Sequence, residues 1–427
     1  MINYFENAIE KTKEIVKIKS VKTASKKDMP FGEGIYNALK FMLSLGDSLG
    51  FNTVNYDNYI GEITFGEGDD ESALAILCHL DVVPEGDESK WLYPPYSATE
   101  VDGKIYGRGV VDDKAPAVLC LYALKELKDN GFIPKRKIKL ILGCDEESGW
   151  DCIEHYKKVA VMPKEGFSPD GDFPVIYAEK GIFHVEFNYK INDRILNLQG
   201  GERVNMVSDY ASAQIADLSS TEIEILTYNG LKIEDGIIKA YGKSAHGSTP
   251  EIGENAIEKL FYGLTKIGLL PKNVYNGLFD NNKTFNTVKD ETGCLTFSPN
   301  VCKVENGIMK VATDIRYPAT YSLDTIKSLL EKIAVYKVLH HQPPIISDKN
   351  GKLVKTLLDI YNKEFNKNEQ PIAIGGGTYA RALENGVAFG PSIVGDSRCH
   401  IPNEFMTIEE LKKCYKIYYK AIKELTK

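Results

Sequence analysis

The sequence of 427 residues contains no apolar run approaching the ~20 residues that a membrane-spanning helix needs. Its first segment, MINYFENAIEKTKEIV, lacks the basic stretch followed by an apolar core that marks a secretory signal peptide. We therefore expect a cytoplasmic protein that has no membrane partner.

Paired cysteines are also missing. The eight cysteines form no C-x-x-C motif, which argues against a thiolate metal site. Most of them lie in apolar or mixed segments, as expected for buried free thiols in a reducing compartment.

The chain has no excess of positive charge. It carries 52 Lys and Arg residues against 60 Asp and Glu residues, a formal net charge of -8. This balance argues against a nucleic-acid partner. The sequence also has no G-K-[ST] phosphate loop.

The residues that are present predict two domains. Buried-strand patterns, such as those ending at Cys78 and Gly143, alternate with helical patterns up to residue 183. We expect an α/β domain with a mainly parallel sheet over residues 1–183 and 375–427. Residues 184–374 show many alternating strand patterns with a few helices, which predicts an inserted α+β domain.

Imidazole and carboxylate groups stand at the ends of several predicted elements of the α/β part. Open α/β sheets bind ligands at the carboxyl ends of their strands, and imidazole–carboxylate sets suit zinc, manganese or cobalt. Each group also has a purely structural interpretation as a helix cap, turn residue or surface residue. Taken together they suit two divalent ions that share a carboxylate. The set is His79, Asp112, Glu146 or Glu147, Asp170 and His400.

These residues stand in motifs that resemble the M20 family of metallopeptidases, in particular its PepV-type bacterial dipeptidases. The motifs are His79-Leu80-Asp81-Val82-Val83-Pro84, Gly107-Arg108-Gly109 with Asp112-Asp113-Lys114, Asp145-Glu146-Glu147-Ser148-Gly149, Ser168-Pro169-Asp170, and His400 with Asn403-Glu404.

The resemblance implies a role for each residue. His79 and Asp170 would hold one metal ion, Glu147 and His400 the other, and Asp112 would bridge the two. Asp81 would orient His79, and Glu146 would be the general base. The two divalent ions are expected to be zinc, with manganese or cobalt as alternatives.

The inserted domain resembles the lid of the same family. His246 in Ala245-His246-Gly247-Ser248 would stabilise the oxyanion of the reaction. Asn205, Arg316, the glycine-rich loop at Gly376 and Arg381 would bind the carboxylate of the substrate. Arg316 also has a structural interpretation, a salt bridge with Asp314.

The resemblance thus implies a monomeric dipeptidase with a small peptide as substrate. Two alternatives stay open at this point. One is an amidohydrolase of N-acyl amino acids on the same scaffold, and the other is a peptide-binding relative without catalysis.

Overall fold

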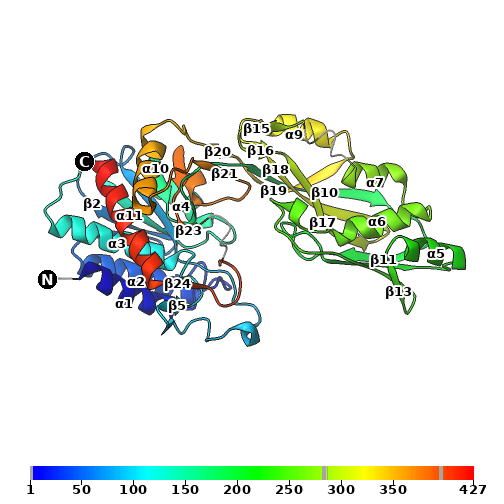
Figure 1. Cartoon of the computed structure of the whole chain (residues 1–427), viewed down its shortest axis with the longest axis horizontal. Coiled ribbons are helices and arrows are strands. Elements are labelled where there is room, and N and C mark those ends of the chain that lie inside the picture. The colour runs from blue at the N-terminus through cyan, green and yellow to red at the C-terminus, as the bar shows by residue number, and fades with distance from the viewer. Residues whose placement is uncertain (1–2, 281–284, 286, 394–397) are drawn as a thin grey trace. The chain divides into compact units, whose positions relative to one another are not determined.

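The chain folds into two compact units (Figure 1). The computed structural model describes residues 3–280, 285, 287–393 and 398–427. The first unit comprises Met1–Tyr177, Ile346–Ile372 and Thr378–Lys427, and the second comprises Ala178–Ile345 and Ala373–Gly377. Helix α10 thus belongs to the first unit, where it packs on α11, although the sequence placed it in the insertion.

The first unit is built on a mixed sheet in which β3 pairs in parallel with β6 and β7, and β7 with β22. The hairpin β1–β2 adds to β6 in the antiparallel direction. In sheet order the strands are β1 Asn52–Tyr56, β2 Ile60–Phe65, β6 Ile138–Gly143, β3 Leu74–His79, β7 Glu165–Ser168, β22 Asn385–Ala388, β9 Ile176–Glu179 and β20 Ile345–Ile346, with β21 Ile372–Ile374 beside β9.

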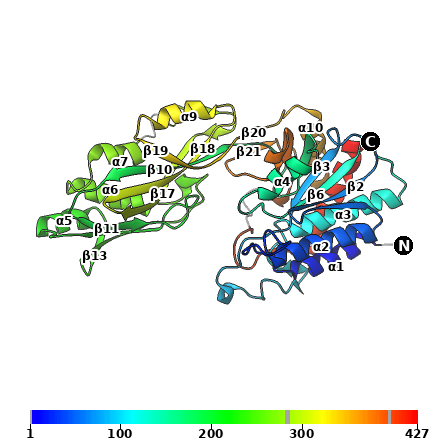
Figure 2. The ribbon, with the colours of Figure 1, turned by 180° about the vertical axis from the view of Figure 1, so that it is seen from behind.

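Helices cover both faces of this sheet. Cα partners place Gly61, Ile63 and Cys78 on one face, and this face packs against α2 and α3. Figure 2 shows α1, α2 and α3 together along one side of β2, β3 and β6. Glu62 points to the opposite face and meets Tyr156 of α4. The helices are α1 Tyr4–Val16, α2 Glu33–Ser48, α3 Lys114–Asp129, α4 Asp151–Val159, α10 Lys352–Phe365 and α11 Ile408–Thr426.

The first unit also contains two small sheets formed by short strands from its loops. The pair β8 and β23 is parallel, and β24 joins β5 and β4 in the antiparallel direction. Their bounds are β4 Thr99–Val101, β5 Lys104–Tyr106, β8 Gly171–Phe173, β23 Pro391–Ile393 and β24 Phe405–Thr407.

The second unit is an antiparallel sheet in the order β13-β14-β12-β11-β17-β18-β10-β19, with its own apolar core. Its strands are β10 Gly181–Lys190, β11 Ile195–Gly200, β12 Tyr210–Ile215, β13 Lys232–Glu234, β14 Ile237–Tyr241, β17 Thr296–Glu305, β18 Ile308–Tyr317 and β19 Tyr336–Gln342. Around it lie α5 Ser220–Tyr228, α6 Ala256–Lys266, α7 Lys272–Phe279, α9 Leu323–Leu330 and the hairpin of β15 Lys289–Asp290 and β16 Gly293–Cys294. The expected α/β fold with an α+β insertion is confirmed.

Two further expectations can be compared with the structure. Among the described residues, no helix has both the length and the apolar character needed to cross a membrane. All eight cysteines are free thiols and most are buried, but Cys294 is exposed.

Candidate active site

His79 is the last residue of β3 and is fully buried at the carboxyl end of that strand. Its backbone N–H donates to Asp113 Oδ2 at 3.2 Å, and its Nδ1 lies 2.8 Å from the carbonyl oxygen of Asp81. Because a carbonyl oxygen only accepts, Nδ1 is the donor in this bond. Nε2 of the neutral ring therefore presents its lone pair to the site, as a metal ligand requires.

Asp112 stands between two imidazole rings. Its Oδ1 lies 2.7 Å from His79 Nε2, and its Oδ2 lies 2.9 Å from His400 Nε2. Asp112 and His400 are far apart in the sequence, since Asp112 precedes α3 and His400 precedes β24. A carboxylate with one nitrogen at each oxygen has the arrangement that a bridging ligand needs.

Glu147 completes the side of the site near His400. Its Oε1 lies 3.2 Å from His400 Nε2. Ligand atoms of His79, Asp112 and Glu147 all lie within 4.8 Å of one another, which makes these three a candidate metal site. Asp170, in the turn between β7 and β8, places its Oδ2 3.6 Å from His79 Nε2.

Asp81 fixes the two consecutive glutamates. Its buried carboxylate accepts from the backbone N–H of Glu146 at Oδ1 and from that of Glu147 at Oδ2, both at 3.0 Å. The expected contact with the His79 ring is made at 2.8 Å by the Asp81 carbonyl, while the carboxylate lies 3.6 Å away. The sequence motif thus ties the His79 strand end to the loop after β6.

Neighbouring charges and burial together raise the pKa values of both imidazoles and of three carboxylates of the site. Burial lowers the pKa of His79 and of His400, but their carboxylate neighbours outweigh it, raising that of His400 to about 11 and that of His79 well above its usual range. Burial raises the pKa of Glu146, of Glu147 and of Asp170, and neighbouring carboxylates add to this effect.

This donor set fits divalent cations. Carboxylates and imidazoles lie together in one buried region. Protons on the imidazoles balance the negative charge of the carboxylates. Cations with imidazole and carboxylate ligands can replace these protons, and this ligand mixture favours zinc, manganese or cobalt.

Glu404 and Arg108 position the loops of the site, a role that the sequence motifs alone did not reveal. Glu404 Oε1 accepts from the N–H groups of Gly109 and Val111 at 3.0 and 2.9 Å, and its Oε2 lies 2.7 Å from Arg108 Nη1. Both charged side chains are almost fully buried. The sequence offered one indication of this role, since Arg108 stands in the motif of Asp112 and Glu404 in the motif of His400.

The second unit gathers the residues expected to contact substrate. The Gly247 N–H donates to the Asn205 carbonyl at 2.8 Å, so these two segments lie side by side. His246 is exposed, and its Nδ1 accepts from the Ser248 N–H at 3.2 Å. Nε2 then carries the proton of the neutral ring and is the nitrogen that can donate.

Arg316 makes the salt bridge that its structural interpretation predicts. Its Nε and Nη2 donate to Asp314 at 2.7 and 2.8 Å, and its Nη1 donates to the carbonyl of Gly375, next to Gly376, at 3.0 Å. A Cβ at Gly247 would lie 2.2 Å from Asp314 Oδ2, so only glycine fits there.

The structure therefore brings Asn205, His246, Arg316 and Gly376 together within the second unit. Arg381 belongs to the first unit, in the 3₁₀ turn Tyr379–Ala382, and its backbone N–H donates to the carbonyl of Thr378 at 3.2 Å.

Comparisons with known proteins show which family and fold this chain resembles. The "Putative dipeptidase YtjP" of Bacillus subtilis (strain 168) is 36% identical over 456 residues, covering 99% of this chain and 98% of that protein. A "Putative dipeptidase" of Staphylococcus epidermidis is 34% identical over 462 residues, covering 99% and 97%. Among solved structures, the di-peptidase Dug1p of Saccharomyces cerevisiae shares the fold with a TM-score of 0.61 at 13% identity, covering 98% and 96%.

A sequence profile described as peptidase family M20/M25/M40 matches residues 75–424. This range contains every candidate metal ligand described above. The match confirms the resemblance inferred from the motifs, and with it the enzyme class of a metallopeptidase. The chain belongs to peptidase family M20/M25/M40.

Proposed function

We propose that this protein is a monomeric, cytoplasmic dipeptidase whose first unit holds two divalent cations. The observation that carries the proposal is the placement of His79 and His400 on opposite oxygens of Asp112. In this proposal His79 and Asp170 hold one cation, Glu147 and His400 hold the other, and Asp112 bridges them. Zinc is the first candidate, with manganese and cobalt next.

Glu146 is the general base of the proposed reaction. When bound, the cations polarise the scissile carbonyl and make water more acidic. Glu146 takes the proton of the attacking water and passes it to the nitrogen of the leaving amine. A pKa raised by burial suits a carboxylate that must accept this proton and then release it. Asp81 holds the Glu146 backbone in place for both transfers.

The second unit acts as a lid that binds the rest of the dipeptide. His246 donates from Nε2 to the oxyanion of the tetrahedral intermediate. Arg316 and Asn205 bind the terminal carboxylate, helped by the Gly376 loop and by Arg381. Asp314 and the Gly375 carbonyl fix the plane of the Arg316 guanidinium, which favours a bidentate contact.

The decisive experiment compares two neighbouring glutamates, Glu146→Gln and Glu147→Gln. We expect Glu146→Gln to keep its bound metal and to lose about 10²–10⁴ in kcat on dipeptides, since it removes only the base. Glu147→Gln should instead lose metal, because it removes a ligand. Metal content is measured by elemental analysis. Hydrolysis is measured with zinc, manganese or cobalt added. Parental activity in Glu146→Gln would overturn the assigned base.

The substrate panel separates the proposal from its rivals. Unmodified dipeptides should be hydrolysed faster than N-acetyl amino acids of the same side chain. Preference for the acetylated compounds would indicate an amidohydrolase. Tight binding of dipeptides without hydrolysis under any added metal would indicate a peptide-binding relative.

A further inference from the structure

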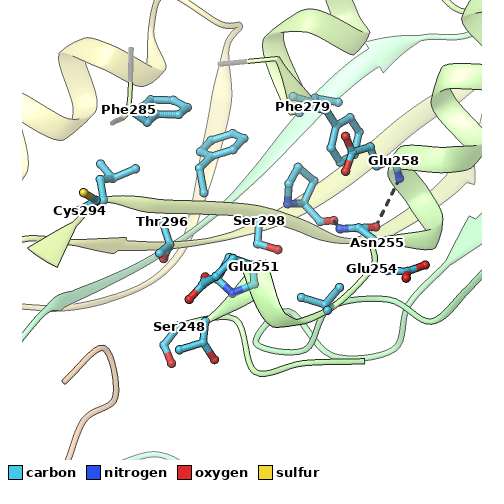
Figure 3. A pocket seen from close by; sticks show the side chains of 18 of the residues that line it. Ser248, Glu251, Glu254, Asn255, Glu258, Phe279, Phe285, Cys294, Thr296 and Ser298 are labelled. Atoms are coloured by element: carbon cyan, nitrogen blue, oxygen red, sulfur yellow. Dashed lines mark hydrogen bonds between the residues drawn. The ribbon is translucent and has the colours of Figure 1, made fainter. Parts of the chain in front are cut away.

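A large pocket lies in the second unit. Its lining contains none of the residues assigned to hydrolysis, but it includes Ser248 and Gly375, the hydrogen-bond partners of His246 and Arg316. Its volume is about 1010 Å³, at the upper end of small-ligand pockets. Strand β17 runs along it, with helices α6 and α7 and the β15–β16 hairpin contributing other parts of the lining (Figure 3). Every residue of its lining belongs to the second unit, and none is a candidate metal ligand.

Glu258 is a carboxylate in this pocket without a partner among the described residues. It lies in the first turn of α6, and its side chain is half-buried. Burial raises its pKa. The charge of the adjacent Lys259 offsets part of this effect, but Lys259 Nζ forms its ion pair with Glu254, at 2.6 Å. A half-buried charge of this kind gains most from a cationic ligand.

Two aromatic rings of α7 line the pocket close to Glu258. The ring centroids of Tyr275 and Phe279 lie 5.8 Å apart, and their helix α7 packs on α6, which carries Glu258. Burial and then the charge of Glu258 raise the pKa of Tyr275 to about 12. Aromatic faces attract ammonium groups, so ring and carboxylate favour the same ligand group.

The rest of the pocket suits the body of a peptide. The rings of Phe285 and Phe297 stack at 4.8 Å and offer an apolar wall. Figure 3 shows Cys294 and Glu258 at opposite ends of the pocket. Lys180 Nζ donates to the Cys294 carbonyl at 2.6 Å at that end, where Glu251 also lines the pocket and its charge acts on the Lys180 ammonium. The apolar wall is therefore what this end offers to a peptide.

We propose that this pocket is a second peptide site, which binds a short peptide with an apolar side chain by its free N-terminal ammonium. The ammonium lies at Glu258 beside Tyr275 and Phe279, and the apolar side chain packs on Phe285 and Phe297.

Binding of a matched pair of tripeptides tests this site. The probes are Phe-Leu-Phe and N-acetyl-Phe-Leu-Phe, titrated calorimetrically into the full chain with EDTA present so that neither is hydrolysed. We expect saturable binding of the free peptide, weakened about tenfold by acetylation, which removes the ammonium charge. Glu258→Gln should weaken the binding of the free peptide by a similar factor. In that variant, acetylation of the peptide should cause no further loss of affinity.

The control is Glu224→Gln, an exposed glutamate of α5 outside the pocket, which should bind the free peptide like the parent. Thermal unfolding of both variants verifies that they fold. The proposal is overturned by a lack of saturable binding, by parental affinity in Glu258→Gln, or by an undiminished acetylation effect in that variant. Because no turnover is measured, these outcomes do not depend on whether the dipeptidase assignment holds.

Discussion

Glu404 is the residue whose replacement should damage the site most without removing a ligand. Its two oxygens accept from Gly109, Val111 and Arg108, just before Asp112 in the chain. In Glu404→Gln, an NH₂ group stands where one of these oxygens accepted, and the buried Arg108 charge loses its carboxylate partner. We expect a loss of about 3–5 kcal/mol in the free energy of unfolding, together with weaker metal binding.

Urea unfolding and metal titration of Glu404→Gln measure the two effects. The matched control is Glu409→Gln, which removes an exposed glutamate of α11 whose ion pair with Lys413 lies at the surface. A surface pair contributes less than about 1 kcal/mol, so this variant should remain close to the parent. Parental stability and metal affinity in Glu404→Gln would contradict the positioning role.

The sequence predicted candidate metal ligands better than the residues that hold their loops in place. His79, Asp112 and the pair Glu146-Glu147 stand at ends of predicted elements, and this placement sufficed to select them as candidates. The roles of Glu404 and Arg108 depend on hydrogen bonds between groups nearly 300 positions apart, which no local pattern encodes. The choice between Glu146 and Glu147 as base likewise rested on the family resemblance, because adjacent glutamates are chemically alike.

At the scale of elements, the first turn of α5 offers a test of pH dependence. Glu222 forms a capping box with Ser219 and also accepts from Arg194 at 2.8 and 3.1 Å. The Arg194 hydrogen bonds, followed by the Ser219 backbone, lower the pKa of Glu222 from 4.5 to about 2. A lowered folded-state pKa stabilises the fold above the unfolded value, and the gain is lost as pH falls through the folded value.

Arg194→Met should therefore reduce stability by less than about 1 kcal/mol at neutral pH, since the pair is partly exposed. The difference from the parent should persist down to about pH 5 and shrink toward about pH 2. Urea midpoints followed by circular dichroism across this range measure it. Lys272→Met, at an exposed lysine of α7, serves as control and should show no such trend. A constant difference at all pH values would contradict the assigned pair.

Patterns along the chain predicted where helices and strands lie more closely than they predicted which elements pack together. The buried-strand patterns expected to end at Cys78 and Gly143 end within one residue of β3 and β6. The residues of α10 fell inside the predicted insertion, 184–374, because an amphipathic pattern does not say which apolar surface a helix covers. The contact of α10 with α11, formed across a gap of more than 40 residues, places it in the first unit.

At the scale of the molecule, the two units have separate cores, and all candidate metal ligands belong to the first. Metal binding should therefore stabilise the first unit alone. A cation at a hundredfold excess over its Kd contributes about 2.7 kcal/mol to the state that binds it. Both tryptophans of the chain, Trp91 and Trp150, lie in the first unit, so their fluorescence reports on its unfolding.

We expect added zinc or manganese to raise the thermal midpoint seen by tryptophan fluorescence, and EDTA to lower it. Circular dichroism follows both units, so it should retain a component whose midpoint does not change with metal. The variant Asp112→Asn supplies the control, because loss of the bridging carboxylate should abolish the metal-dependent shift of fluorescence. Equal shifts of every component would show instead that the units unfold together, and no shift at all would contradict a metal site in the first unit.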